Sequence, residues 1–279
     1  MPHWEFPIRF GEDQFVELTN DESQPFGPWN RLVVPVIVTD GVTSRVCGSA
    51  WFICPGVVLT ARHVLDEHVD RVRRGELGLG VLFASDQRVP DQPEGPWYVF
   101  LGVEGVSMSS EPGGHDLALL TTAIPFIGET MASGLTLPLT FARPREGVSV
   151  MALGYPQAVV GEPASSTSSL TIGALIAAQG TLREVHAPRR DGCVLTFPVF
   201  RSDYPSPHGM SGGPIVAEHG YVCGAVASAY DTEGDRLSYG SLLAPALNLS
   251  TPEGQTLYDL CEAGEARSDG SHRLYRPTG

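Results

Sequence analysis

The chain has 279 residues, a mass of 29.8 kDa and a formal net charge of −14. A surface of this charge repels phosphate backbones, so nucleic-acid binding is not expected, and no apolar run approaches the roughly 18 residues of a membrane-spanning helix. All eighteen basic residues are arginine, which excludes chemistry that needs a lysine amine, such as a Ser-Lys dyad or a pyridoxal Schiff base.

Short β-rich runs separated by turn residues recur along the chain. Enrichment in Val, Ile and Phe, together with 32 glycines and 23 prolines, indicates antiparallel sandwiches or barrels. The predicted strands are, in chain order, 31–38, 49–54, 56–61, 96–103, 116–122, 147–155, 193–200, 213–217 and 221–228. Residues 1–30, before the first predicted strand, are expected to form an N-terminal extension.

The clearest helical pattern lies near the end of the chain, in "TPEGQTLYDLCEAGEAR" (251–267). Thr251 is the predicted N-cap and Pro252 the first helical residue, and Leu257, Leu260 and Cys261 fall on one face. This pattern predicts a helix that packs on the second half of the molecule. Residues 250–279 are therefore expected to form a C-terminal helix and a polar tail.

Five cysteines are present, an odd number without a Cys-x-x-Cys pair: Cys47, Cys54, Cys193, Cys223 and Cys261. Structural zinc is not expected from this spacing, and buried free thiols are favoured over disulfides. The sequence "HVLDEHVD" (63–70) does not change this, because its two histidines are five residues apart and do not share a helical face. We expect no metal, no cofactor and, without a visible export signal, a cytoplasmic protein.

The sequence "HGMSGGPIV" (208–216) contains a candidate nucleophile, Ser211. Its Gly-x-Ser-x-Gly pattern also occurs in the nucleophile elbow of α/β-hydrolases, but an elbow needs a strand before the serine and a helix after it. Here "SDYPSPH" precedes the serine and Pro214 follows it. An elbow-type esterase would also need a histidine after the serine, which leaves only His219 and His272, so this interpretation is the weaker one.

Histidine and acid candidates lie upstream of the serine instead. "VVLTARHVL" (57–65) places His63 after an apolar strand. "GGHDLALL" (113–120) places Asp116 where a glycine-containing loop leads into a second apolar strand. In such a trio the imidazole takes the serine proton, while a buried carboxylate fixes the imidazole tautomer. The N–H groups of Gly209 and Ser211 are candidates for an oxyanion hole, because glycine relieves crowding of the intervening backbone.

These residues resemble the motifs of the trypsin-like, chymotrypsin-fold serine peptidases. "LTARHV" is similar to their histidine motif, "HDLALL" to their aspartate motif and "GMSGGPIV" to their serine motif, in the same order. The resemblance covers about residues 31–249, and "SVMALGYP" (149–156) and "AQGTLREV" (178–185) resemble strands of the second barrel in this family.

The resemblance implies an all-β fold of two antiparallel six-stranded barrels, followed by the C-terminal helix. Residues 31–128 would form the first barrel, with His63 and Asp116, and residues 129–249 the second, with Ser211. The implied activity is that of a serine endopeptidase, which hydrolyses peptide bonds through an acyl-enzyme without a cofactor and takes a protein or peptide as substrate. The alternative is a catalytically silent module on the same fold that binds a regulatory protein partner in a larger complex.

Three positions depart from the pattern of the secreted members. Val64 and Pro207 stand where those members carry bridging cysteines, and Met210 stands where they carry an aspartate that pairs with a newly cut N-terminus. The resemblance therefore implies a bacterial or intracellular type, which is not activated by insertion of its N-terminus.

Residues for substrate selection are assigned through the resemblance alone. It places Pro205, six residues before the serine, at the base of the primary pocket, which would favour small or apolar side chains. If Asp203 reached the pocket instead, basic side chains would be favoured. Ala227, Ser228 and Ala229 are expected along the cleft, and which of them faces it depends on a register that the sequence leaves open.

Overall fold

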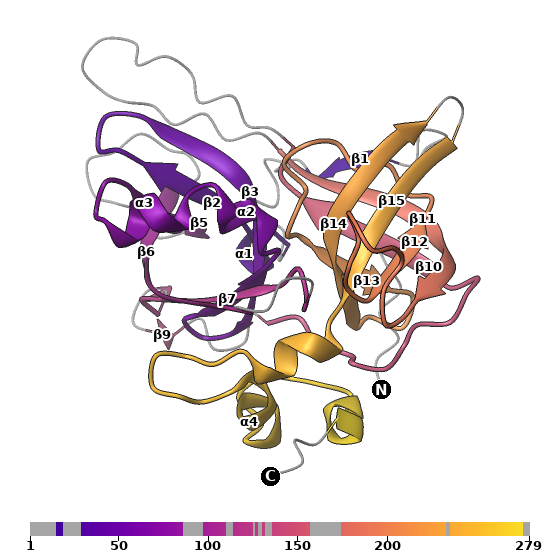
Figure 1. Cartoon of the computed structure of the whole chain (residues 1–279). Helices are drawn as coiled ribbons and strands as arrows, with labels where there is room; N and C mark the ends of the chain where they lie inside the picture. Colours follow the sequence, from indigo (N-terminus) through magenta and orange to yellow (C-terminus); the bar gives the residue numbers. More distant parts are fainter. Residues whose placement is uncertain are drawn as a thin grey trace.

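The computed structural model describes residues 15–18, 29–85, 97–109, 114–124, 126–127, 130–131, 136–156, 174–232 and 235–275. Most of the expected N-terminal extension (1–30) and the end of the polar tail lie outside these residues. Two β-barrels lie side by side, and the C-terminal segment, drawn in yellow, lies below both of them (Figure 1).

The first barrel is a closed antiparallel sheet with the strand order β2-β3-β4-β7-β6-β5. Its strands are β2 (Val33–Thr39), β3 (Ser44–Cys54), β4 (Val57–Thr60), β5 (Gly78–Ser85), β6 (Trp97–Met108) and β7 (Ala118–Thr122). The short helix α1 (Trp29–Leu32) precedes β2, and two more, α2 (His63–Asp66) and α3 (Val69–Arg73), follow β4. Val34, Phe52 and Phe83 belong to its core, as expected for strands that alternate between a barrel interior and its outer face.

The second barrel has the strand order β11-β10-β13-β14-β15-β12 and is closed by pairing of β11 with β12. Its strands are β10 (Ser149–Gly154), β11 (Leu175–His186), β12 (Val199–Ser202), β13 (Pro214–Ala217), β14 (Val222–Thr232) and β15 (Asp235–Leu242). The two six-stranded antiparallel barrels implied by the family resemblance are thereby confirmed.

A seventh strand, β1 (Phe15–Leu18), joins the second barrel from the N-terminal extension. It pairs with β11 over Leu175–Ala178, whereas β12 pairs with the later part of β11, from Leu182 onward. The remaining elements are the small hairpin β8 (Phe126–Ile127) and β9 (Thr130–Met131), the 3-10 helices η1 (Ala244–Asn248) and η2 (Ser271–Tyr275), and α4 (Leu257–Glu262).

The predicted strand 193–200 is wrong over most of its length, since β12 begins only at Val199. One carboxylate oxygen of Asp191 accepts the N–H groups of Cys193, Val194 and Leu195 at 2.8, 2.7 and 3.2 Å. These bonds tie the segment into a turn, because an aspartate side chain competes with the sheet for nearby backbone donors. Apolar composition alone does not reveal this competition.

The predicted C-terminal helix exists, but it is shorter than 251–267 and starts later. The N-cap of α4 is Thr256, not Thr251, and its side chain forms a capping box with Asp259. Residues 251–255 instead close a turn, in which Thr251 N–H donates to Gln255 O and Gly254 has a φ of +87°. Leu257, Leu260 and Cys261 are buried, as the helical pattern predicts.

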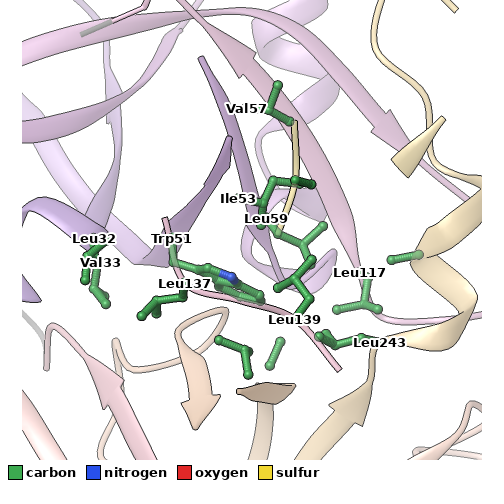
Figure 2. Packing of buried hydrophobic residues seen from close by; sticks show 14 of the residues in the cluster. Leu32, Val33, Trp51, Ile53, Val57, Leu59, Leu117, Leu137, Leu139 and Leu243 are labelled. Atoms are coloured by element: carbon green, nitrogen blue, oxygen red, sulfur yellow. The ribbon is translucent and has the colours of Figure 1, made fainter. Parts of the chain in front are cut away.

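The largest apolar cluster lies between the two barrels and the C-terminal segment. Figure 2 shows Trp51 of β3 among leucines that include Leu59 and Leu137, and Leu153 of β10 and Leu257 of α4 belong to the same cluster. Such close-packed contacts fix the barrels relative to each other. Residues from different barrels can therefore form one site with a defined geometry.

All five cysteines are free thiols. Cys54, Cys223 and Cys261 are buried, as predicted, while Cys47 is half-buried and Cys193 is exposed. Burial raises the pKa of the Cys47, Cys54, Cys223 and Cys261 thiols to about 12. Among the described residues, no helix is long and apolar enough to cross a membrane.

Candidate active site

The first barrel brings His63 and Asp116 together through the pairing of two neighbouring strands. β4 ends at Thr60, which is paired with Ala118 at the start of β7. His63 follows β4 and begins α2, while Asp116 lies just before β7. Because antiparallel neighbours bring the end of one strand next to the start of the other, residues 53 apart in sequence meet at one barrel end.

Asp116 holds His63 through both of its carboxylate oxygens. Oδ1 accepts the backbone N–H of His63 at 2.9 Å, and Oδ2 lies 2.8 Å from Nδ1 of the imidazole. An ionised carboxylate only accepts hydrogen bonds, so Nδ1 carries the proton and Nε2 of a neutral His63 is free to accept one. The aspartate is buried, whereas the histidine side chain is 40% exposed.

The environment of His63 raises its pKa above the ordinary value of 6.5. Desolvation lowers this pKa, but the hydrogen bond and the charge of Asp116, together with the charge of Asp66, outweigh it. An imidazole with this pKa changes its charge close to neutral pH, as a general base requires.

Ser211 lies in the second barrel, on the loop between β12 and β13. Gly209 and Gly212 flank it with φ values of +97° and +82°, conformations that glycine adopts without steric cost. Between them Met210 is fully buried in the core of the second barrel. The strand β13, not a helix, follows the serine, so the nucleophile-elbow interpretation is wrong.

The serine loop packs directly against the part of the first barrel that carries His63. Ser211 O accepts the N–H of Ser49 in β3 at 2.8 Å. A Cβ atom at Gly212 would lie 2.2 Å from Oγ1 of Thr60 and 2.9 Å from the backbone nitrogen of Ala61. Ser211 is half-buried at this boundary, on the side where α2 begins.

Two backbone N–H groups of the loop are available to a ligand. The Met210 N–H donates to Pro207 O at 3.3 Å, and the Gly212 N–H donates to Val226 O at 2.8 Å. Within the described ranges, no backbone carbonyl accepts the N–H of Gly209 or of Ser211. These are the two donors that the sequence suggests for an oxyanion hole.

A cleft of about 380 Å³ opens beside His63. Its lining comes from both barrels and comprises Arg62, His63, Asp66, His115, Asp116, Val194, Leu195, Thr196, Phe197, Ala227 and Ser228. A register shift in the pairing of β14 with β15, between Val226 and Ser228, brings two consecutive residues of β14 to the cleft. Strand alternation alone would have predicted only one of them.

Two of the residues suggested for substrate selection do not line this cleft. Pro205 is buried and Ala229 is exposed to solvent, so their proposed contacts with a substrate stay predictions. Asp203 is engaged elsewhere: its carboxylate accepts the backbone N–H of Thr181 and pairs with the guanidinium of Arg183, 2.8 Å from Nε. Asp203 does not line the cleft beside His63, and selection of basic side chains by Asp203 stays a prediction.

Sequence reasoning missed the wall formed by residues 194–197 because that run was assigned to a strand. It also missed Arg62, whose guanidinium donates to Asp66 and to Ser109 O at 3.1 Å each. His115 lines the cleft as well, but its Nδ1 accepts the N–H of Leu117. In the part of the chain that the structure describes, no three His, Cys, Asp or Glu residues are grouped to hold a metal ion.

Comparison with known proteins places this architecture among peptidases. A family model of the trypsin-like peptidase domain matches residues 48–224. The HtrA-type protease AlgW with a tripeptide is 19% identical with a TM-score of 0.52, over 84% of this chain and 62% of that one. The MamO protease domain from Magnetospirillum magneticum (apo form) is 20% identical with a TM-score of 0.50, over 77% of this chain and 93% of that one. No curated protein sequence gives a significant match.

Proposed function

Because the chain belongs to the trypsin-like peptidase family, we propose that it is a serine endopeptidase that cleaves peptide bonds through an acyl-enzyme. The observation that carries this proposal is the two-point contact of Asp116 with His63, at 2.9 and 2.8 Å, just after the end of β4 against which the loop of Ser211 packs at Gly212. A carboxylate that holds both the backbone and the ring of one histidine fixes its orientation as well as its tautomer.

In the proposed reaction, Nε2 of His63 takes the proton of the Ser211 hydroxyl while Oγ attacks the carbonyl carbon of the substrate. The carbonyl oxygen becomes an oxyanion, which the free N–H groups of Gly209 and Ser211 stabilise. His63 then gives its proton to the leaving amine as the C–N bond breaks. Water, deprotonated by the same histidine, hydrolyses the acyl-enzyme and restores the serine.

The cleft supports an extended peptide as the substrate. β13 pairs with β14 only as far as Ala225, so Ala227 and Ser228 have β15 on one side and the cleft on the other. A peptide can add to such a strand through backbone hydrogen bonds. We propose that the apolar side chains of Val194, Leu195 and Phe197 cover it from the opposite wall.

A fluorophosphonate probe tests this function, because it phosphonylates a serine only where a general base activates it. We expect labelling at Ser211 in the intact protein at pH 8, and loss of labelling in Ser211→Ala and His63→Ala. The matched control is His219→Ala, since His219 is exposed in the turn between β13 and β14 and outside the proposed triad.

Labelling that persists in His63→Ala, or that is lost in His219→Ala, would contradict the proposed roles. If the wild type is neither labelled nor cleaves any peptide of a library, and captures a protein equally well as Ser211→Ala, the silent binding module is the correct interpretation.

A further inference from the structure

Ser49, a fully buried serine of the first barrel, contacts the loop of the second barrel that carries Ser211. The paired part of β3 and β4 begins at Ala50, which faces Thr60. Ser49 lies one residue before this pair, so β4 does not take its N–H. That N–H crosses to the other barrel and donates to Ser211 O at 2.8 Å.

The hydroxyl of Ser49 makes two more bonds to the second barrel. It donates to Gly209 O at 2.9 Å and accepts the N–H of Tyr155 at 2.9 Å. The Ser49 carbonyl accepts the hydroxyl of Thr60 at 2.7 Å. Water does not compete for these bonds, because both serine and threonine are fully buried.

These bonds fix the peptide planes of the serine loop. Gly209 O and the Met210 N–H belong to one planar peptide, which Ser49 holds at the oxygen and Pro207 O at the N–H. In the next peptide, Met210 O accepts the N–H of Gly213 at 2.9 Å. The Ser211 N–H lies in the same peptide plane, antiparallel to the Met210 C=O, and therefore points away from the turn.

We propose that Ser49 is a positioning residue: from the first barrel it holds the loop so that the Ser211 N–H faces the oxyanion. The expected effect on kcat rests on the proposed function, whereas the hydrogen bonds of Ser49 to the serine loop do not depend on it. Loss of one oxyanion donor costs about 100- to 1,000-fold in kcat. When the donor is displaced but still present, kcat should fall less, by about 10- to 100-fold.

The test compares Ser49→Ala with Ser202→Ala in the full chain. Ser202 is a similarly buried serine at the end of β12, and its hydroxyl donates to the backbone carbonyl of Thr181 at 2.8 Å rather than to Gly209. We expect kcat to fall about 10- to 100-fold in Ser49→Ala with KM little changed, and both constants to stay near wild type in Ser202→Ala. Ser49→Cys, which keeps the shape but weakens the donor, should give an intermediate kcat.

Hydrogen exchange of the Gly212 and Gly213 amides supplies a readout that does not need activity. We expect about tenfold faster exchange in Ser49→Ala or Ser49→Cys than in Ser202→Ala, because local opening becomes easier. Unchanged exchange, or an equal fall of kcat in both alanine variants, overturns the role of Ser49. If the wild type is inactive but the exchange of these amides is still faster in Ser49→Ala, the proposed catalysis is refuted. The positioning contact of Ser49 is then still supported.

Discussion

At the scale of single residues, the pair of His63 and Asp116 determines how the proposed activity depends on pH. The base must be neutral, so kcat/KM should rise with pH through the pKa of His63 in the free enzyme. This pKa is raised above 6.5, and we expect the midpoint above 6.5 and more activity at pH 8 than at pH 5. The measurement is a kcat/KM profile with a peptide whose chemistry is rate-limiting, and a flat profile would mean that another group is the base.

The same shift has the opposite sign for stability. A histidine whose pKa is raised by folding stabilises the folded state below its unfolded value near 6.5, and this contribution is lost as the pH rises through the raised pKa. Between pH 6.5 and the raised pKa of His63 in the folded protein, a rise in pH should therefore increase kcat/KM and slightly decrease the free energy of unfolding.

Asp116→Asn should remove the upward shift in the pKa of His63, and with it the corresponding pH dependence of activity and of stability. Without the carboxylate, desolvation dominates and the pKa of His63 falls below 6.5, so the midpoint of any residual activity moves to lower pH. The amide also favours the wrong imidazole tautomer, and we expect kcat to fall by roughly 10⁴-fold. A variant with normal kcat would show that Asp116 does not orient the base; the profile of Asp66→Asn provides the comparison for the smaller charge effect.

Gly212 provides a residue-scale test of the close contact between the barrels. Gly212→Ala would place a methyl group 2.2 Å from Thr60 Oγ1 in a backbone with φ +82°. Gly147→Ala is the matched control, because Gly147 has φ +84° and open space around its Cβ position. We expect the control to lose about 1 kcal/mol of unfolding free energy and Gly212→Ala at least about 2 kcal/mol more. Equal losses by chemical denaturation would mean that the loop adapts to the methyl group.

At the scale of elements, the turn at Asp191 holds one wall of the cleft. Asp191→Ala removes the acceptor for three backbone N–H groups next to Val194 and Leu195, so the wall should lose its fixed position. We expect KM for peptides to rise about fivefold, which corresponds to about 1 kcal/mol, with kcat unchanged. The measurement is steady-state kinetics on one apolar peptide.

Asp40→Ala is the control for that turn. Asp40 accepts the N–H groups of Val42 and Thr43 at 2.9 and 2.7 Å in the β2–β3 hairpin, outside the cleft lining. Its kinetic constants should match those of the wild type. A rise of KM in both variants would point to general loosening rather than to the cleft wall.

Elements are predictable from the sequence where composition is decisive, and are not where local hydrogen bonding competes or where a strand lacks an apolar run. Strand β4 and the buried face of α4 follow from runs of Val and Leu, which have few alternatives to burial. β15 (Asp235–Leu242) was missed because its charged and small residues do not form an apolar run. The pairing of His63 with Asp116 could be predicted from their motifs, but the role of Ser49 could not, since its partners in the second barrel lie 106 to 162 residues away in the sequence.

At the scale of the whole molecule, strand β1 (Phe15–Leu18) makes part of the N-terminal segment a structural component of the second barrel. β1 covers an edge of β11 that β12 leaves unpaired, and Met210 is fully buried in the core of the second barrel. Deletion of residues 1–18 should therefore lower the Tm, by about 2–4 °C for each kcal/mol lost, and should not increase the acylation rate. Acylation that appears only after removal of these residues would refute this expectation. The comparison is the intact chain, with mass spectrometry to confirm its N-terminus.

The exposed thiol of Cys193 has a consequence for labelling chemistry. A thiol with a pKa of about 12, the value that burial gives the other four cysteines, is a thiolate in roughly one molecule in 10⁵ at pH 7. A maleimide dye should therefore attach to Cys193 alone, without any engineered cysteine. Because the next residue, Val194, lines the cleft, the emission of that dye should change when a peptide binds, so the natural chain carries its own attachment point for an optical binding assay.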